Sequence, residues 1–254
     1  MCLVCAAACH QNRHPINIEF SATWAGQPLT CSSSDPSLTD LRFFVSDVTL
    51  IDASGQDYPF AFKADGRWQQ EHVGLIDLEN GEGGCVNGTK ETNFRLTGSA
   101  KGIDFDGIRF TIGVPFDSNH ANPLLADAPL DDSAMHWHWR SGYKFLRAGV
   151  ATASDGFWIH LGSTACEGTV QDISVCRSPN RVTVQLAGFS RENNRIRFDL
   201  AQLLDGVDLT DGVKSDCSSG PSESACVAPF EALGLPIGSL VVRPMPNIIF
   251  EIDH

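Results

Sequence analysis

The sequence predicts an all-β protein, an antiparallel β-sandwich or barrel-like domain with long loops, few short helices and stabilising disulfides. Three observations support this fold class. Short alternating or β-branched runs recur along the chain, turn-forming Gly, Asn, Asp and Pro separate them, and most cysteines lie in loop-like contexts. The 254 residues are 42% hydrophobic, which is enough for a large core, and we expect a single domain over residues 11–254.

The predicted strands follow one another in order along the chain. They cover residues 16–24, 40–52, 93–100, 107–115, 135–151, 156–163, 181–189, 195–204 and 247–253. The segment DLAQLLDGVDL, residues 199–209, is the best candidate for a short helix, and no segment keeps the periodicity of a long one. A long, acidic, proline-bearing loop over residues 115–132 leads into the fifth strand, and loops of this length on a β scaffold are often functional.

The charge balance excludes one large class of partner. Acidic residues outnumber basic ones 31 to 18, which gives a formal net charge of −13. A field of this sign repels phosphate backbones, so we expect no nucleic-acid partner. The acidity suits attraction of cations or docking to a basic protein surface, and it also suits simple solubility.

Nine cysteines fall into two groups. Three of them crowd the first ten residues, and six are spread through the rest of the chain: Cys31, Cys85, Cys166, Cys176, Cys217 and Cys226. The six lie in Gly/Ser/Asn-rich segments without the spacing of a zinc ribbon, and they predict disulfides formed in an oxidising compartment. The short spacings favour disulfides between Cys166 and Cys176 and between Cys217 and Cys226, which leaves Cys31 to pair with Cys85.

The N-terminal segment MCLVCAAAC resembles the end of a secretory leader. It is small and apolar, and Cys9 is a candidate lipid acceptor if the leader is of the lipoprotein type. We therefore interpret residues 1–10 as the remnant of a secretion signal. The predicted location is the periplasm or the extracellular space, with an outer-membrane lipoprotein as the tethered form, and no apolar run is long enough to span a bilayer.

The segment MHWHWRSGYKF, residues 135–145, concentrates metal ligands and indoles. In a regular strand Trp137 and Trp139 would share one face with Met135, while His136 and His138 would share the other. Two imidazoles on one face suit copper, nickel or zinc. The competing interpretation is that the tryptophans belong to the core and the histidines to a solvated outer face.

Two further histidines are candidates for the same site. His160 lies beside Trp158 in the strand GFWIHLGS, and His120 lies in the long loop just before HWHW. A metal site on a sandwich needs ligands that are distant in sequence and converge in space. The remaining histidines have no such context and are treated as ordinary: His10, His14, His72 and His254.

Hydrolase and calcium chemistry have weaker support. The chain contains no GxSxG, HExxH, P-loop or GxGxxG motif, and Asp131 with Asp132 is more typical of a turn than of an acid/base pair. A metal-dependent hydrolase that uses His120, His160 and an acid remains an alternative. Calcium is a further candidate ligand, through oxygen-bearing side chains in loops: Asp47, Asp77, Glu79 and Asp117.

Several motifs together resemble the MbnP family, the four-cysteine member of a "metallo-mystery pair". They are DLRFFVSDVTLID, VGLIDLENGEGGCVNGTKETN, GIRFTIGVPFDSNHANPLLADAPL, MHWHWRSGYKF and FWIHLGSTAC. The resemblance implies a non-enzymatic protein that binds copper as Cu(I) and is partnered by a dihaem MbnH-type enzyme related to bacterial cytochrome c peroxidases. That partner would oxidise Trp137 or Trp139 to kynurenine, while His120 and His160 match the family's NH and HLGS elements.

One departure concerns His136 and His138, which occupy positions expected to vary in the family. Strict alternation would place them opposite the tryptophans, so His120 and His160 are preferred as copper ligands unless a bulge at residues 140–142 re-aims the strand. The runner-up from another class is a disulfide-stabilised structural or adhesive surface protein, in which both tryptophans belong to the core.

Overall fold

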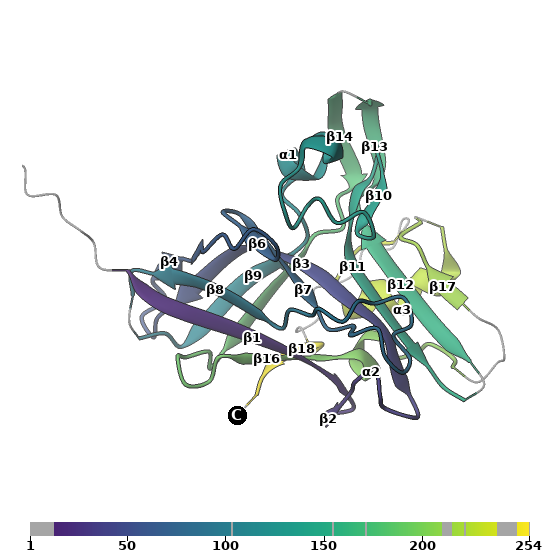
Figure 1. Cartoon of the computed structure of the whole chain (residues 1–254), viewed down its shortest axis with the longest axis horizontal. Helices are drawn as coiled ribbons and strands as arrows, with labels where there is room; N and C mark the ends of the chain where they lie inside the picture. The colour runs from purple at the N-terminus through teal and green to yellow at the C-terminus, as the bar shows by residue number, and fades with distance from the viewer. Residues whose placement is uncertain are drawn as a thin grey trace, which may run out of the picture.

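The computed structural model describes residues 13–102, 104–153, 155–170, 172–209, 215–220, 222–237 and 248–253. The predicted leader remnant, residues 1–10, and Cys9 lie outside these ranges. Two sheets and one projecting hairpin make up the fold (Figure 1). Within the described ranges no helix has the length and apolar character needed to cross a membrane.

The smaller sheet has the strand order β18-β16-β1-β8-β5, with β2 paired to β1. Its strands are β1 (His14–Trp24), β2 (Gln27–Pro28), β5 (Ala61–Phe62), β8 (Arg95–Ala100), β16 (Arg195–Asp199) and β18 (Phe250–Ile252). Strands β1 and β16 pair in parallel.

The larger sheet has the order β15-β9-β3-β11-β12-β17, and four short strands pair along it. Its main strands are β3 (Ser37–Ile51), β9 (Gly107–Ile112), β11 (Gly142–Ala151), β12 (Gly156–Gly162), β15 (Val182–Ala187) and β17 (Ser215–Cys217). The short ones are β4 (Asp57–Pro59), β6 (Gln69–Gln70), β7 (Val73–Asp77) and β10 (His136–His138). Strands β12 and β17 also pair in parallel, so the sheets are mixed and not purely antiparallel as predicted.

The third sheet is the hairpin of β13 (Thr164–Thr169) and β14 (Asp172–Ser178), which projects beyond the two main sheets (Figure 1). The helices are short: α1 (Phe116–Asn119), α2 (Leu200–Leu203), α3 (Val227–Ala232) and the 3₁₀ turns η1 (Pro123–Leu125) and η2 (Ser224–Cys226). The helix predicted at residues 199–209 is present but much shorter: α2 ends at Leu203, and the Asp199 side chain accepts hydrogen bonds from the backbone N–H groups of Ala201 and Gln202 at its start.

The main core lies between the two sheets. It is centred on phenylalanines in edge-to-face or tilted contact, each contributed by a different strand: Phe20, Phe43, Phe110, Phe198 and Phe250. A second, smaller cluster lies on the other face of β3 and β11, where Phe44, Tyr143 and Phe145 pack with Leu130 of the long loop and with Met135 just before β10. Strand alternation therefore places Phe43 in the main core and Phe44 under the loop.

The sandwich prediction is confirmed, and the described sheets form no closed barrel. The three predicted disulfides are also confirmed: Cys31–Cys85, Cys166–Cys176 and Cys217–Cys226. Two predicted strands were wrong in extent. The strand predicted over residues 195–204 ends at Asp199, where α2 follows. Residues 135–151 do not form a single strand, because the chain turns after His138, where the Ser141 N–H donates to the His138 carbonyl, and then continues as β11.

Candidate metal centre

The candidate site lies where the long loop, the HWHW segment and the projecting hairpin meet. Figure 1 shows α1 beside β14 of the projecting hairpin and β10 near the base of the hairpin. A surface cleft at this junction is lined by residues of all three segments: Asn119, His120, Ala121, Asn122, Pro123, His136, Trp139 and Val170. Two of the predicted ligands, His120 and His136, and one of the predicted tryptophans, Trp139, therefore share one cleft.

Asn119 fixes the position and the proton of His120. Its side chain is buried, and its Oδ1 accepts from the Tyr143 N–H at 2.8 Å while its Nδ2 donates to the Ser141 carbonyl at 2.9 Å. These two backbone partners leave no freedom to exchange the oxygen and nitrogen of the amide. The same Nδ2 lies 3.1 Å from His120 Nε2, so that ring nitrogen must accept the hydrogen bond and the neutral imidazole carries its proton on Nδ1.

Gly142 makes room for this arrangement. Its φ is +77°, a left-handed conformation that glycine adopts readily. A Cβ at Gly142 would lie 2.3 Å from both the carbonyl oxygen and the Oδ1 of Asn119. The Gly-Tyr pair that opens β11 thus provides both the space for Asn119 and one of the groups that orient it.

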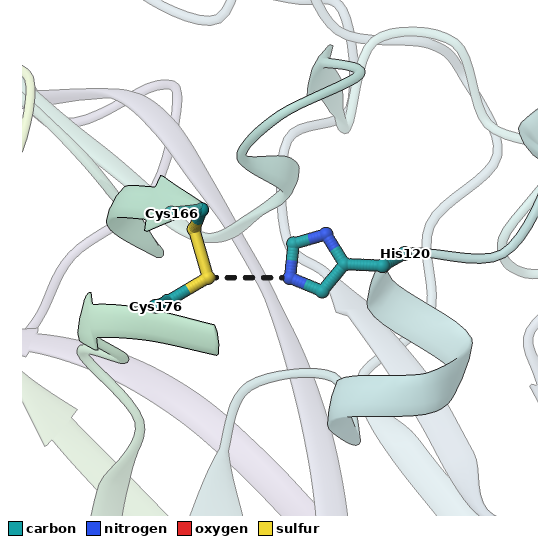
Figure 2. Close-up of side chains that lie close together, drawn as sticks. All are labelled: His120, Cys166 and Cys176. Atoms are coloured by element: carbon teal, nitrogen blue, oxygen red, sulfur yellow. Dashed lines mark hydrogen bonds between the residues drawn. A yellow bond between two sulfur atoms is a disulfide. The ribbon is translucent and has the colours of Figure 1, made fainter. Parts of the chain in front are cut away.

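One ring nitrogen of His120, Nδ1, makes no hydrogen bond to another described residue. This atom is buried, and buried polar groups are almost always paired. Burial lowers the pKa of the His120 imidazole, which favours the neutral form that ligates metals. In Figure 2 the Nε2 atom of His120 faces the Cys166–Cys176 disulfide, whereas Nδ1 points away from it.

His136 reaches the cleft from the start of β10. Its ring contacts Tyr143 edge-on, with the centroids 5.4 Å apart, and the Tyr143 hydroxyl donates to the Leu130 carbonyl at 2.6 Å. Burial, with smaller contributions from His138 and Lys144, lowers the pKa of His136. This histidine is therefore held on a rigid base and kept neutral near neutral pH.

The two tryptophans lie in different surroundings. Trp139 packs against the Cys166–Cys176 disulfide and lines the cleft, with Arg140 stacked over its ring at 4.9 Å. Trp137 packs over β12, where a Cβ at Gly162 would lie 2.9 Å from its Cε3 atom. Both indoles are half-buried, so neither is sealed in the core.

Strict alternation of the HWHW segment was wrong. Pairing between β10 and β11 shifts register between His136 and His138, so the extra residue on β10 is Trp137, and the irregularity precedes the bulge predicted at residues 140–142. Strand β10 then ends at once in the turn to Gly142. Because the regular strand is interrupted, His136 and Trp139 line the same cleft instead of opposite faces.

The other two predicted histidines lie outside the cleft lining. His138 is exposed and lies tilted against Trp139, with ring centroids 5.5 Å apart. His160 lies on β12 opposite Arg147, and burial followed by the charges of Arg147 and Lys144 lowers its pKa. Because alternate residues of a strand share a face, His160 lies on the side of β12 on which Trp137 covers Gly162.

The four predicted calcium ligands do not gather into one site, because two of them pair with arginine side chains instead. Asp47 is exposed and pairs with Arg181 in a short contact, and Asp117 lies in the first turn of α1. Asp77 and Glu79 are buried near Arg42, and Glu79 is in direct contact with its guanidinium. In the part of the chain that is described, no cluster of three metal-capable side chains includes any of the four.

Sequence reasoning missed Asn119 and Gly142 as site residues. The motifs NHANP and SGYKF contain both, yet neither residue type is a metal ligand of choice, and only the fold reveals that they touch each other. The available signal was their position in the sequence: Asn119 directly precedes His120 and Gly142 closely follows the HWHW segment, and both lie within motifs that resemble the MbnP family.

Comparison with known proteins places the chain in a family. No curated protein matches it. The solved structure of MbnP from Methylosinus trichosporium is similar with a TM-score of 0.80 and 24% sequence identity, over 95% of this chain and 98% of that one, and the likeness shows a shared fold. The family model for MbnP matches residues 13–219, which is most of the sequence, and the chain therefore belongs to the MbnP family.

Proposed function

We propose that this chain is an exported copper-binding protein in which Trp139 is the tryptophan converted to kynurenine. The copper ligands are then His120, His136 and the ring-opened side chain of residue 139. Membership of the MbnP family fits a copper-related accessory protein without catalytic activity of its own. The three disulfides support export, because such bonds form and persist in oxidising compartments.

One observation carries the proposal. Two imidazoles from separate segments, His120 and His136, line one cleft together with a half-buried indole. The His120 Nδ1 atom is buried without a partner among the described residues, although buried polar groups are almost always paired. Copper binding at Nδ1 would move the ring proton to Nε2 and break the hydrogen bond from Asn119 Nδ2. Neutral imidazoles suit copper, and burial favours the neutral form of both.

The modification supplies the third donor. Oxidation by a dihaem partner with two molecules of hydrogen peroxide cleaves the indole C2–C3 bond and gives N-formylkynurenine and two molecules of water. Hydrolysis then consumes water and releases formate. The product carries an aromatic amine and a ketone, so a side chain with a poor donor becomes one that ligates metal. No atom of His120 or His136 is consumed in either step.

The rim of the cleft supports access by a protein partner. Leu124 and Leu125, next to Pro123 of the cleft lining, are 90% and 81% exposed, and Val170 on the hairpin is 58% exposed. Exposed aliphatic side chains grouped on one side of a soluble protein are typical of an interaction surface. A haem enzyme seated there would lie close to Trp139.

The rival functions have less support. A structural or adhesive role predicted both tryptophans in the core, whereas both are only partly buried. A hydrolase would need an acid beside its metal ligands, but the side chains that line the described cleft include no carboxylate. It would also use His160, which lies outside that lining.

Copper titration of kynurenine-containing protein tests the ligand set. The protein is co-produced with its dihaem partner, and Cu(I) is titrated against a competing chromophoric chelator. His120→Ala and His136→Ala should each weaken binding by about 10-fold or more, because each removes one bond to the metal. His160→Ala and His72→Ala are the matched controls and should bind as the unaltered protein does. Equal affinity in all four variants would rule out this ligand set.

A further inference from the structure

We infer that the β13–β14 hairpin holds a second, redox-gated metal site. When the Cys166–Cys176 disulfide is reduced, the two thiolates and the Nε2 atom of His120 form a three-donor site for a soft cation such as copper(I). The site needs no kynurenine and does not depend on the function proposed above. It uses the opposite nitrogen of His120 from the one left unpartnered.

The three donor atoms are already gathered. His120 Nε2 and both sulfurs lie within 4.8 Å of one another, and Nε2 is 3.4 Å from the Cys176 sulfur (Figure 2). A metal bonded to sulfur at ~2.3 Å and to imidazole at ~2.0 Å, with a tetrahedral angle, holds those two ligand atoms about 3.5 Å apart. Once reduction separates the sulfurs, the imidazole needs only a small shift.

The imidazole is also in the required tautomer. Asn119 donates to Nε2 and thereby keeps the proton on Nδ1, so Nε2 presents a lone pair on the side of the sulfurs. While the disulfide is intact neither sulfur carries a proton, and the 3.4 Å contact is between two groups without a hydrogen to share. A metal that binds at Nε2 replaces the hydrogen bond from Asn119 Nδ2, and the imidazole proton stays on Nδ1.

The hairpin can keep its shape without the covalent bond. Cys166 and Cys176 lie directly opposite each other in the antiparallel ladder, and backbone pairing flanks them on both sides. Ile173 and Trp139 pack against the same two cysteines. Reduction therefore frees the sulfurs to rotate about their Cα–Cβ bonds while the strands stay paired.

The chemistry balances with a dithiol as the reductant. Thiol–disulfide exchange transfers two electrons and two protons from the dithiol to the Cys166–Cys176 bond, and the reductant leaves as its own disulfide. Binding of copper(I) then displaces the two thiol protons. Thiolate sulfur and imidazole nitrogen are the donors that copper(I) prefers, whereas the sulfurs of the intact disulfide are poor ligands.

The test uses the full chain with its tryptophans unmodified. The protein is reduced anaerobically with dithiothreitol, freed of it on a desalting column, and titrated with copper(I) against a competing chelator. Cys166→Ser/Cys176→Ser, treated in the same way, retains every other thiol. We expect the unaltered protein to bind one equivalent more than this double variant, with stronger copper–thiolate absorption. Equal stoichiometry and absorption would overturn the assignment.

Histidine variants separate this site from the kynurenine site. In the reduced protein His120→Ala should weaken the extra equivalent by about 10-fold or more, and His136→Ala should leave it unchanged. Unchanged binding in His120→Ala would mean that the thiols bind without the imidazole, which contradicts the proposed ligand set. Because His136→Ala should weaken only the kynurenine site, failure of one proposal does not imply failure of the other.

Discussion

At the scale of single residues, the candidate site depends on the side-chain amide of Asn119, which is not itself a proposed metal ligand. Asn119 satisfies the Tyr143 N–H and the Ser141 carbonyl, and it orients the His120 ring. Its replacement leaves buried backbone groups unpaired, and each such group costs about 1–3 kcal/mol. Asn119→Ala should therefore lower the free energy of unfolding by about 2–4 kcal/mol, measured by urea denaturation.

Asn122→Ala provides the matched control for this prediction. Asn122 is exposed and accepts from the Leu124 N–H at the start of η1, and loss of such a cap costs about 1 kcal/mol. If both variants lose the same stability, Asn119 does not have the central structural role assigned to it.

Gly142 yields a second prediction at this scale. Gly142 and Gly66 have nearly the same φ, +77° and +76°, but a Cβ at Gly66 meets nothing within 4 Å, whereas one at Gly142 overlaps Asn119. Gly66→Ala should cost only the conformational term, about 1–2 kcal/mol. Gly142→Ala should cost at least about 2 kcal/mol more, measured by thermal or urea unfolding. Equal losses would show that the contact with Asn119 relaxes freely.

At the scale of elements, sequence periodicity predicted the regular strands well and the HWHW segment poorly. Strands β1, β3 and β9 lie within three residues of their predicted ranges at each end. Alternation fails at residues 135–142, because a register shift and a tight turn depend on contacts with the distant loop that sequence periodicity does not encode. This is why His136 was assigned to the wrong face relative to Trp139.

A buried ionic cluster joins β3, β7 and β11 to the loop before β10. Arg42 contacts Glu79 and lies 3.8 Å from Asp132, while Arg147 pairs with Asp40. Burial raises the pKa of Asp77 to about 7, despite the opposing effects of the Glu79 N–H and of Arg42. Burial, followed by the charge of Asp40, raises the pKa of the Glu79 carboxyl as well.

This cluster makes stability depend on pH. A carboxyl whose pKa is raised on folding binds a proton more tightly in the native state, so its contribution is present below pH ~4 and is lost as the pH rises towards ~7. Asp77→Asn preserves an oxygen that can accept from the Glu79 N–H. Its stability advantage over the unaltered protein should grow from near zero at pH ~4 to a plateau above pH ~7, on the order of 2–4 kcal/mol at most.

Urea unfolding at a series of pH values measures this difference. Carboxyls far from Asp77 titrate alike in both proteins, whereas the charge of Asp77 contributes to the raised pKa of Glu79. The difference between the two curves therefore measures Asp77 together with its effect on Glu79. Parallel curves across the whole range would show that the buried Asp77 is already ionised in the folded protein at low pH.

At the scale of the whole molecule, the sandwich supplies a rigid base and the long loop supplies the site. The loop is anchored on the outer face of the larger sheet through Leu130, and through Met135 just before β10, and the hairpin closes the other side of the cleft. The fold class and the disulfides could be read from the sequence, and so could the two motifs that carry the candidate ligands His120 and His136. The pairing of His120 with His136 could not, because it depends on how the loop packs against β11.

The net negative charge leads to a prediction about association with the proposed dihaem partner. With a net charge of −13, attraction to a basic enzyme surface should weaken as salt screens it, since the Debye length is about 10 Å at ~0.1 M. The second-order rate of tryptophan oxidation should fall several-fold between ~0.02 and ~0.2 M salt, while the rate at saturating protein stays nearly constant. A second-order rate that is independent of salt would show that charge does not guide the encounter.

The most direct test of the account is to locate the oxidised residue. The protein is isolated from a host that contains the active dihaem partner, and the peptide that spans residues 110–140 is fragmented by tandem mass spectrometry. We predict that the gain of one oxygen and the loss of one carbon map to Trp139, while Trp137 stays intact. Modification confined to Trp137, on the β12 side that carries His160, or the absence of modification from both tryptophans, would contradict the assignment of the cleft as the copper site.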